Sequence, residues 1–519
     1  MKFNKHKKKE KGRFTTNHMG QKALQLSPEV ELASLLLTSF AADSYYRAEG
    51  ESLDRLRELV GRVDAEFAAK AAVYARTEFG MRSISHALAA ELAAGASGKA
   101  WGVKFYNKIV HRPDDMLEIM AAYQAKRGGN PTNAMKKGFA KTFDRFDGYQ
   151  LAKYRGDGKA VKLVDLVNLV RPVPNARNAE ALKALVAGTL RNTATWEAKL
   201  TEAGQTAQTE ADKAVRKAEA WEELITERKI GYFALLRNLR NIVECVRPEV
   251  LDAALELLTD RNLLRKSLVL PFRFLSAYAE IEKLAAAGSF ESEKRRIDKV
   301  LAAIEKAATL AVDNLPTLEG RTVILSDNSG SMTGDSGGAS LVSRMSRTKT
   351  SDIANLFAVM YWMKAEDTLV GLFGDHLIYP ELKRGAGLFE NFKRVDAEKD
   401  KCGPSTERGI FDLFERLVRE RIQADTIVIF SDTQIGDGCG WYDSKGNRGK
   451  QFMDLFAKYR EMYPHTMIYS VDLRGYGTTV FDGSVIKIAG WSEKIFDLMA
   501  QAATDKDALV NSIRAVTWD

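Results

Sequence analysis

Oxygen-bearing side chains follow two apolar runs in the C-terminal part of the chain. One run is followed by Asp327, Ser329 and Ser331, another by Asp432, and Thr406 lies in a polar loop between the two runs. Carboxylates and hydroxyls are hard ligands of the kind that Mg²⁺ prefers. The candidate ligands of a divalent cation are therefore Asp327, Ser329, Ser331, Thr406 and Asp432.

Other interpretations of these residues stay open. Asp327 and Ser329 could instead cap a helix or shape a turn, as short polar side chains commonly do. Ser405, next to Thr406 in the segment GPST, could take its place as a ligand. A nucleophilic serine is disfavoured because the sequence indicates no histidine base beside these serines. The chain also contains no P-loop and no GxGxxG nucleotide motif.

The elements that must hold these residues are short, continuous apolar runs. They are TVILSD (322–327), TLVGLF (368–373), TIVIFSD (426–432) and MIYSVD (467–472). Helical segments separate them, and strands buried on both faces with helical crossovers are typical of a doubly wound parallel sheet. Such sheets bind ligands beyond the carboxyl ends of their strands. The sequence therefore predicts that the oxygen cluster lies at one edge of a parallel sheet.

From Ser27 to Lys306 the pattern is helical throughout. Apolar residues recur at three- and four-residue spacing, and short turns such as HRPDD and RPVPN separate the segments. Many helices with short turns predict stacked helix pairs, an α-solenoid of HEAT-like repeats. The Ala-, Glu- and Lys-rich stretch 195–221 is predicted to form one long exposed helix.

The predicted fold class is α + α/β, divided into three parts. Residues 1–20 are predicted to be a disordered basic tail because they contain almost nothing to bury. Residues 21–315 are predicted to form the helical-repeat domain, and residues 316–519 the α/β domain.

Charge is distributed unevenly along the 519 residues. The net charge is +8, but residues 1–200 hold 34 Lys and Arg against 21 Asp and Glu, whereas residues 301–519 hold 26 against 31. A basic N-terminal part favours a polyanionic partner, although a Lys-rich helical surface can also be basic without one.

The sequence also indicates the cellular compartment in which we expect the protein. No apolar run is long enough to span a membrane, and the basic start is not followed by the apolar stretch of a secretory signal. The three cysteines are scattered without CxxC spacing, which argues against a zinc site or a disulfide framework. We therefore expect a cytoplasmic monomer with no membrane partner.

Motifs in both parts resemble one family. The pattern DxSGS after a first strand, a later loop Thr and an Asp after a central strand are similar to the metal-ion-dependent adhesion site of von Willebrand factor A domains. In the helical part, LLLTSFAADSYYRAEGESL (35–53) and FALLRNLRNI (233–242) resemble TROVE modules. This order of modules is similar to that of the Ro ribonucleoprotein family, and the resemblance covers nearly all of the chain after about residue 25.

The resemblance implies a function as well as a fold. It implies a ring of helical repeats closed by the A domain and no catalytic activity. It further implies binding of small noncoding Y RNAs on a basic outer face and of single-stranded 3′ ends of misfolded RNA in a central hole. An exoribonuclease such as polynucleotide phosphorylase is the implied partner in RNA quality control.

The resemblance also points to particular cations. Lys153 and Arg155 match a Lys-Tyr-Lys/Arg stretch in the Y RNA-binding segment of the family, and Arg171 stands at about the position of a His. The aromatic and His residues that usually precede that His are replaced by KAVKLV, which argues against ordinary Y RNA specificity. Singly, each cation could be a solvated surface residue. The candidate RNA-binding residues are Lys136, Lys137, Lys141, Lys153, Arg155, Lys159, Lys162, Arg171 and Arg177.

Three functional hypotheses follow. The first is an RNA-binding scaffold without its own catalysis. The second is a metal-dependent adhesion scaffold whose A domain binds an acidic partner, with Mg²⁺ as the expected cation. The third, a metal-dependent nuclease or phosphatase, is disfavoured because the sequence offers one carboxylate pair and no evident general base or second metal.

Overall fold

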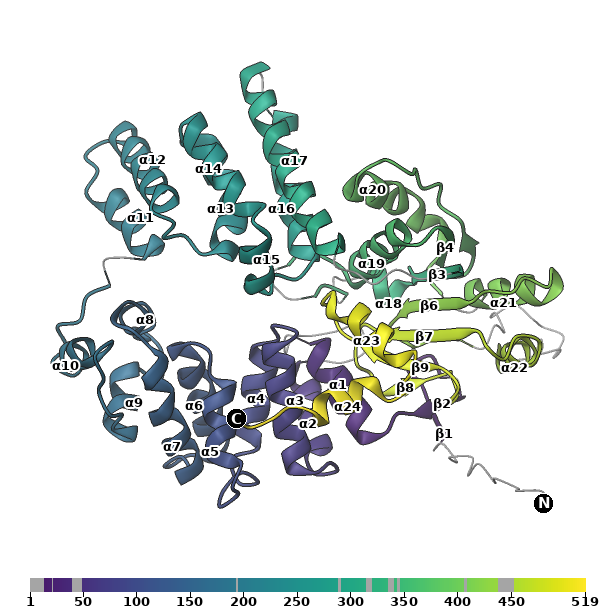
Figure 1. Cartoon of the computed structure of the whole chain (residues 1–519), viewed down its shortest axis with the longest axis horizontal. Helices are drawn as coiled ribbons and strands as arrows, with labels where there is room; N and C mark the ends of the chain where they lie inside the picture. Colours follow the sequence, from purple (N-terminus) through teal and green to yellow (C-terminus); the bar gives the residue numbers. More distant parts are fainter. Residues whose placement is uncertain are drawn as a thin grey trace. The chain divides into compact units, whose positions relative to one another are not determined.

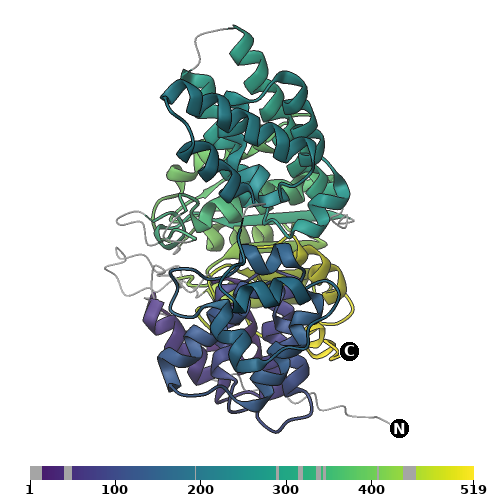
Figure 2. The same cartoon turned by 90° about the vertical axis from the view of Figure 1, so that its left-hand side faces the viewer.

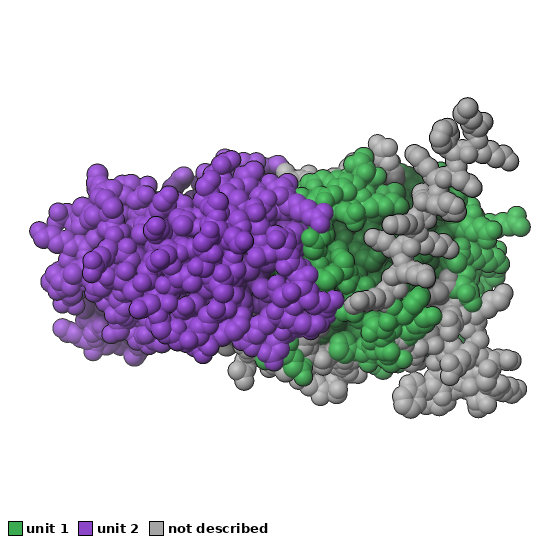
Figure 3. Space-filling model, turned by 90° about the horizontal axis from the view of Figure 1, so that it is seen from below, with its two compact units in different colours: residues 1–52, 315–512 green, residues 53–314, 513–519 purple. Residues whose placement is uncertain are grey.

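The computed structural model describes residues 14–20, 22–39, 49–192, 195–287, 291–313, 320–334, 340–342, 346–405, 408–436 and 452–519. The chain divides into two compact units, each assembled from two stretches of sequence. An α/β unit comprises residues 1–52 and 315–512, and a helical unit comprises residues 53–314 and 513–519 (Figure 3).

The helical unit begins within α2 and continues to α17 (Figures 1 and 2). Its elements are α2 (Glu49–Val60), α3 (Ala65–Thr77), α4 (Ser83–Glu91), α5 (Gly102–Ile109), α6 (Pro113–Arg127), α7 (Asn133–Thr142), the 3-10 turn η1 (Phe143–Arg145), α8 (Gly148–Lys153), α9 (Leu163–Val170), α10 (Ala179–Val186), α11 (Trp196–Gln205), α12 (Glu210–Thr226), α13 (Tyr232–Cys245), α14 (Pro248–Leu258), α15 (Arg261–Ser267), α16 (Phe272–Ala287) and α17 (Glu291–Asp313).

Helices of this unit pack mainly on helices close to them in sequence. The pairs α3–α4, α5–α7, α11–α12, α13–α14 and α16–α17 are in contact, and Figure 1 shows the last three as successive pairs. Gly138 lets α7 lie close to α5, since a Cβ there would lie 2.4 Å from the Cβ of Tyr106. Aromatic rings such as Phe105 and Phe139 are fully buried between the helices.

The stretch 195–221 differs from its prediction. It forms two helices, α11 and α12, which are in contact with each other, instead of one long exposed helix. The break occurs because Thr209 caps α12, with its hydroxyl accepting a hydrogen bond from the Asp212 N–H at 3.1 Å. The rings of Trp196 and Trp221 then stack with centroids 5.9 Å apart and join the two helices.

The α/β unit contains two sheets and the helices that flank them. Its elements are β1 (Phe14–Thr16), β2 (Lys22–Gln25), α1 (Pro28–Leu37), β3 (Arg321–Asp327), α18 (Gly330–Thr333), α19 (Thr350–Lys364), β4 (Asp367–Phe373), β5 (Leu377–Ile378), α20 (Leu388–Glu398), the 3-10 turn η2 (Lys399–Cys402), α21 (Gly409–Arg419), β6 (Thr426–Ser431), α22 (Phe452–Met462), β7 (Met467–Asp472), β8 (Thr478–Thr479), β9 (Ile486–Ala489), α23 (Lys494–Ala502) and α24 (Ala508–Arg514).

The larger sheet has the strand order β5-β4-β3-β6-β7-β9. All neighbouring strands are parallel except the β4–β5 pair. Helices cover both faces: Phe414 of α21 and Phe456 of α22 join the core on one face, and Phe357 of α19 packs on Phe430 of β6 on the other. The predicted fold class, a helical part followed by a doubly wound parallel sheet, is confirmed.

The two ends of the chain lie in units other than those predicted for them. Residues 14–37 belong to the α/β unit, because β1 pairs with β2, β2 pairs with β8, and α1 packs against β9. Residues 513–519 belong to the helical unit. These assignments correct the predicted boundaries at residues 20 and 21 and at the C-terminus. The first strands, of three and four residues, are too short to carry a strand pattern, and their partner strand lies far along the chain.

Within the described parts of the chain, no helix is both long and apolar enough to cross a membrane. Cys245 and Cys402 carry free thiols. Cys439 lies outside the described residues.

Candidate functional site

The first candidate site lies at the carboxyl ends of β3 and β6. These strands are adjacent and parallel, with Ser326 opposite Phe430, so the residues that end them meet at one edge of the sheet. Asp327 and Asp432 are both fully buried there, with no exposed surface. The structure therefore brings together the two carboxylates that the sequence places 105 positions apart.

Hydroxyl groups surround the carboxylate of Asp327. Its Oδ2 accepts a hydrogen bond from Ser431 Oγ at 2.6 Å, and its Oδ1 accepts one from the Ser329 N–H at 2.9 Å. The hydroxyls of Ser329 and Ser331 are 3.2 Å apart and almost completely buried. Three of the predicted ligands from the first loop thus form one compact group of oxygen atoms.

Asp432 has one carboxylate oxygen without a partner. Its Oδ1 accepts a hydrogen bond from the Gln434 N–H at 3.0 Å. Its Oδ2 is buried and has no hydrogen-bond partner among the described residues. Because an unpaired buried acceptor is costly, this oxygen needs a ligand that the described residues do not supply. A divalent cation fits such an oxygen.

The electrostatics of the pair favour a cation as well. Burial, followed by the nearby Asp432 carboxylate, raises the pKa of Asp327 to about 7. Burial also raises the pKa of Asp432. Two buried carboxylates that repel each other would be neutralised by one divalent ion.

A third loop approaches the same edge of the sheet. The Gly330 N–H donates to the Pro404 carbonyl at 2.6 Å, and the His376 N–H donates to the Cys402 carbonyl at 2.8 Å. Gly403 permits this path with a φ of 76°, and a Cβ there would lie only 2.4 Å from Asp375 Oδ2. Ser405 is half-buried, whereas Thr406, the predicted ligand, lies outside the described residues.

The sequence interpretation did not identify several residues that hold this site in place. Ser431 was not identified, although its position directly before Asp432 was a signal for it. Asn328 and Asn355 exchange amide hydrogen bonds of 2.8 and 3.0 Å behind the first loop, and no local pattern indicated this pairing. The His18 N–H donates to Gln434 Oε1 at 2.9 Å, so the N-terminal hairpin contacts the loop that carries Asp432.

The second candidate site is the cationic part of the helical unit. Lys137 and Lys141 lie one turn apart on the exposed face of α7, and Lys136 beside them is half-buried. Helix α9 packs on α7, and α10 packs on α9. Further exposed cations lie in the turns before and after α9, which itself carries none. These exposed cations are Lys159, Lys162, Arg171 and Arg177.

Two of the predicted cations already have partners in the helical unit. Lys153 Nζ lies 3.6 Å from Glu197 Oε2. Arg155 forms an ion pair with Asp157 and donates a hydrogen bond to the Leu190 carbonyl. Lys137, Lys141 and Lys162, in contrast, form no ion pair with any other residue that the structure describes. Of the nine predicted cations, the structure thus leaves six exposed, bonds Lys153 and Arg155 within the unit, and half-buries Lys136.

Comparison with known proteins identifies the helical part. The sequence matches the TROVE domain family over residues 32–215 and 192–318, which together are more than half of the chain. It is 24% identical to mouse telomerase protein component 1 over 356 residues and 23% identical to the rat protein over 314. These matches cover 50% and 45% of this chain but only 13% and 12% of those relatives.

A solved structure extends the likeness to the fold of both units. The crystal structure of the Deinococcus radiodurans Ro (RSR) protein aligns with a TM-score of 0.58 and 19% sequence identity. The alignment covers 92% of this chain and 100% of that one, so the fold is Ro-like across the helical and α/β parts. With the sequence match over residues 32–318, these findings establish that the chain belongs to the TROVE-domain family.

Proposed function

We propose that this protein binds RNA and has no catalytic activity of its own. The observation that carries the proposal is the group of exposed cations on α7 and in the turns around α9, in a chain of the TROVE-domain family. Lysines without internal partners are free to neutralise phosphates and release the counterions of the RNA.

The kind of RNA and the protein partner that we propose come from the resemblance to the Ro family. The RNA on the cationic face would be a small noncoding, Y-like RNA. Single-stranded 3′ ends of misfolded RNA would bind within the helical part, as in the Ro proteins that the chain resembles. An exoribonuclease such as polynucleotide phosphorylase would then act on the bound RNA in a quality-control pathway.

The test compares two charge-reversed variants of the full chain. The first carries Lys137→Glu, Lys141→Glu and Lys162→Glu. The control carries the same change in charge at three exposed lysines of the α/β unit, Lys383, Lys458 and Lys506. Fluorescence anisotropy measures the affinity for a labelled stem-loop RNA with a single-stranded 3′ tail.

We expect the first variant to bind the RNA about 10- to 100-fold more weakly than the wild type, because three phosphate contacts are replaced by repulsion. The control should bind nearly as well as the wild type. Equal losses in both variants, or no binding by the wild type at low salt, would contradict the proposal.

A second function is favoured by one specific observation, the unpartnered Oδ2 of Asp432. We propose that Asp327, Ser329, Ser331 and Asp432, with Thr406, hold a Mg²⁺ ion in an A-domain site. When bound, the ion would supply a positive charge, and an acidic group of a protein partner could complete its coordination shell. The protein itself would hold the loops in place through Ser431 and the Asn328–Asn355 pair.

Isothermal titration with MgCl₂ tests this site. The wild type should bind one Mg²⁺, Asp432→Asn should lose binding, and Asp375→Asn, outside the proposed ligand set, should retain it. Binding that survives Asp432→Asn would contradict the proposed ligand set. In the same buffer, labelled RNA incubated with protein and Mg²⁺ should remain intact, whereas cleavage by the wild type and not by Asp432→Asn would favour a nuclease.

A further inference from the structure

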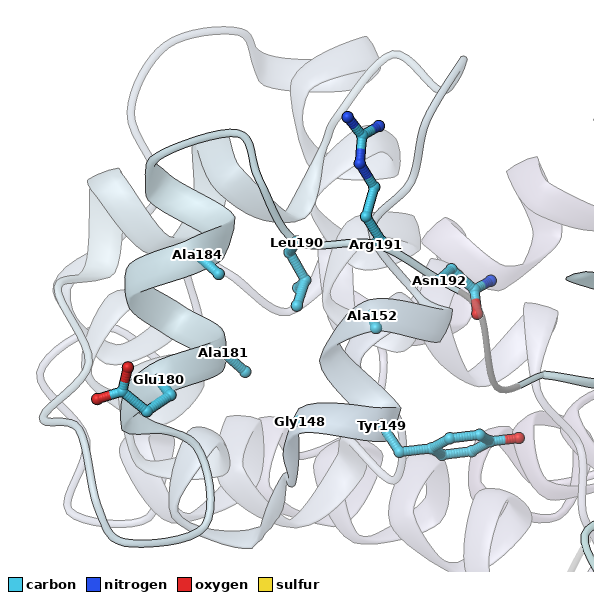
Figure 4. A pocket seen from close by; sticks show the side chains of 9 residues that line it. All are labelled: Gly148, Tyr149, Ala152, Glu180, Ala181, Ala184, Leu190, Arg191 and Asn192. Carbon is cyan, nitrogen blue, oxygen red and sulfur yellow. The ribbon is translucent and has the colours of Figure 1, made fainter.

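A cavity of about 470 Å³ opens between α8 and α10 in the helical unit (Figure 4). Its floor is formed by the small side chains of Ala152, Ala181 and Ala184, together with Leu190. The two helices pack directly against each other, so these residues come from a single packed region. A volume of this size is in the range of small-molecule sites and accommodates a planar heterocycle.

The rim of the cavity carries groups of a different kind. Tyr149 is 41% exposed, although large aromatic residues of the helical unit are mostly buried. Arg191 is exposed, forms no ion pair with another described residue, and extends away from the apolar floor in Figure 4. Asn192 Oδ1 is buried but accepts no hydrogen bond from the residues that the structure describes. The Glu180 carboxylate points away from the floor.

These features complement the parts of a nucleotide. A base presents two apolar faces, and the alanine floor suits one of them. The Tyr149 ring extends from the rim away from Ala181 and Ala184 in Figure 4 and offers an exposed stacking surface beside the cavity. An exocyclic amino group at the edge of the base would donate to Asn192 Oδ1, the acceptor left without a partner. A phosphate on the sugar would face the Arg191 guanidinium at the rim.

The cavity is also joined to the cationic residues described above. Leu190, part of its wall, accepts a hydrogen bond from Arg155 through its carbonyl oxygen. Ala152 directly precedes Lys153 at the end of α8. An RNA strand with a base in the cavity would therefore pass beside Lys153 and Arg155, although both already have partners within the helical unit.

We propose that the cavity between α8 and α10 binds one unpaired nucleobase that carries an exocyclic amino group, which is adenine, cytosine or guanine but not uracil. This inference rests on the proposed RNA binding and adds base recognition to it. Base stacking tolerates different sequences, whereas the acceptor at Asn192 gives a preference for bases with an amino donor.

The experiment uses the full chain and three labelled 12-nucleotide probes: oligoadenylate, oligouridylate and an abasic ribose-phosphate strand. The abasic strand has the same backbone charge as oligoadenylate but no bases. Fluorescence anisotropy at fixed salt gives the three affinities. The wild type should bind oligoadenylate about tenfold more tightly than the abasic strand, with oligouridylate between them.

Three variants then show which residues produce the preference for oligoadenylate over the abasic strand. Ala181→Phe fills the cavity without changing charge and should abolish the preference for oligoadenylate while leaving binding of the abasic strand unchanged. Tyr149→Ala should reduce the preference about tenfold, and Tyr149→Phe, which keeps the ring, should retain it. Circular dichroism and thermal unfolding show that each variant is folded.

The outcomes separate this inference from the proposed function. If all three probes bind equally, or if Ala181→Phe and Tyr149→Ala keep the full preference, the cavity is not a base site although the protein binds RNA. If no probe binds at low salt, both proposals are wrong. A preference that Ala181→Phe and Tyr149→Ala remove and Tyr149→Phe preserves supports the base site.

Discussion

At the scale of single residues, the carboxylates of Asp327 and Asp432 are two completely buried acidic groups at one edge of the large sheet. Folding removes both from water, and each buried charge costs several kcal/mol unless it is compensated (on the order of 20 kcal/mol before relaxation). Hydrogen bonds from Ser431, Ser329 and Gln434 compensate them in part. The remaining repulsion makes the stability of this unit depend on protons and on cations.

The metal-free protein should therefore be less stable at neutral than at mildly acidic pH. The pKa of Asp327 is about 7 in the folded state, above the unfolded value of about 3.9, so the folded state binds the proton more tightly. Its contribution to stability is fully present below about pH 4 and is lost as the pH rises to about 7, at ~1.4 kcal/mol for each unit of pKa difference. Thermal unfolding of the α/β unit in EDTA at several pH values measures this.

Added Mg²⁺ should raise the unfolding temperature more at about pH 7.5 than at about pH 5, because the ion competes with the proton for the carboxylates. Asp327→Asn removes the titrating group and should flatten the pH dependence in EDTA. A wild-type α/β unit that becomes steadily more stable from about pH 4 to pH 7 without metal would contradict this account.

The types and order of residues predicted the candidate metal ligands but not the residues that hold those ligands in place. Asp327, Ser329, Ser331 and Asp432 could be found because each follows a strand whose apolar run is recognisable. The contact of Gln434 with the N-terminal hairpin could not be found, because its partner lies 416 positions away and no local pattern encodes it. Nor could the sequence distinguish Arg155 from a freely exposed cation, because its hydrogen bond to the Leu190 carbonyl forms only in the folded chain.

At the scale of secondary-structure elements, a buried ion network joins α3, α4 and α6. Asp115 of α6 is completely buried and bonded to Arg76 of α3 at 3.1 Å and to Arg82 before α4 at 2.8 Å. Its Oδ2 also accepts the His111 N–H at 2.8 Å at the start of α6. Burial opposes ionisation, but the His86 ring, whose Nε2 lies 3.3 Å from Asp115 Oδ1, and the charges of Arg76 and Arg82 hold the pKa of Asp115 well below its usual range.

Asp115→Asn should destabilise the helical unit by about 3–5 kcal/mol, because it leaves the buried Arg76 guanidinium without a countercharge. Arg82 keeps its ion pairs with Asp114 and Glu118. Glu58→Gln is the matched control, since the Glu58 side chain is 51% exposed where it pairs with Arg62 on the surface of α2. That change should cost less than about 1 kcal/mol. Urea unfolding measures the free energy of unfolding of both variants. Similar small losses in the two would show that the ion network contributes little to the stability of the helical unit.

Helices and strands were predicted best where the local sequence pattern agrees with the burial of the element in the folded chain. The strands of the large sheet are buried on both faces, so their composition alone identifies them. The division of 195–221 into α11 and α12 was missed, although the sequence Thr209-x-x-Asp212 carries the signal of a helix start. Strands β1 and β2 have three and four residues and lacked any such signal.

At the scale of the whole molecule, each unit incorporates a segment from the opposite end of the chain. In the α/β unit, Leu32 and Leu36 of α1 are completely buried. In the helical unit, Trp518 stacks on Trp101 at 6.0 Å, and its Nε1 donates to Glu66 at 2.8 Å. Neither unit is therefore a contiguous stretch of sequence.

A fragment of residues 316–512 should consequently be unstable on its own. It lacks β2, which pairs with β8, and it lacks the buried leucines of α1, each of which contributes about 1.5–3 kcal/mol when buried. Adding a peptide of residues 14–39 should restore its cooperative unfolding transition. A fragment that unfolds at the same temperature with and without the peptide would contradict this division of the chain.

In the proposed function, RNA is held by phosphate contacts to the exposed cations of α7 and of the turns around α9. The slope of log Kd against log salt concentration for the 3′-tailed stem-loop RNA tests it most directly, because each lysine–phosphate contact contributes about 0.7–0.9 to that slope. The slope should fall by about 2–3 in the variant with Lys137, Lys141 and Lys162 reversed to Glu, and remain unchanged in the Lys383, Lys458 and Lys506 control. An unchanged slope in the first variant would contradict the claim.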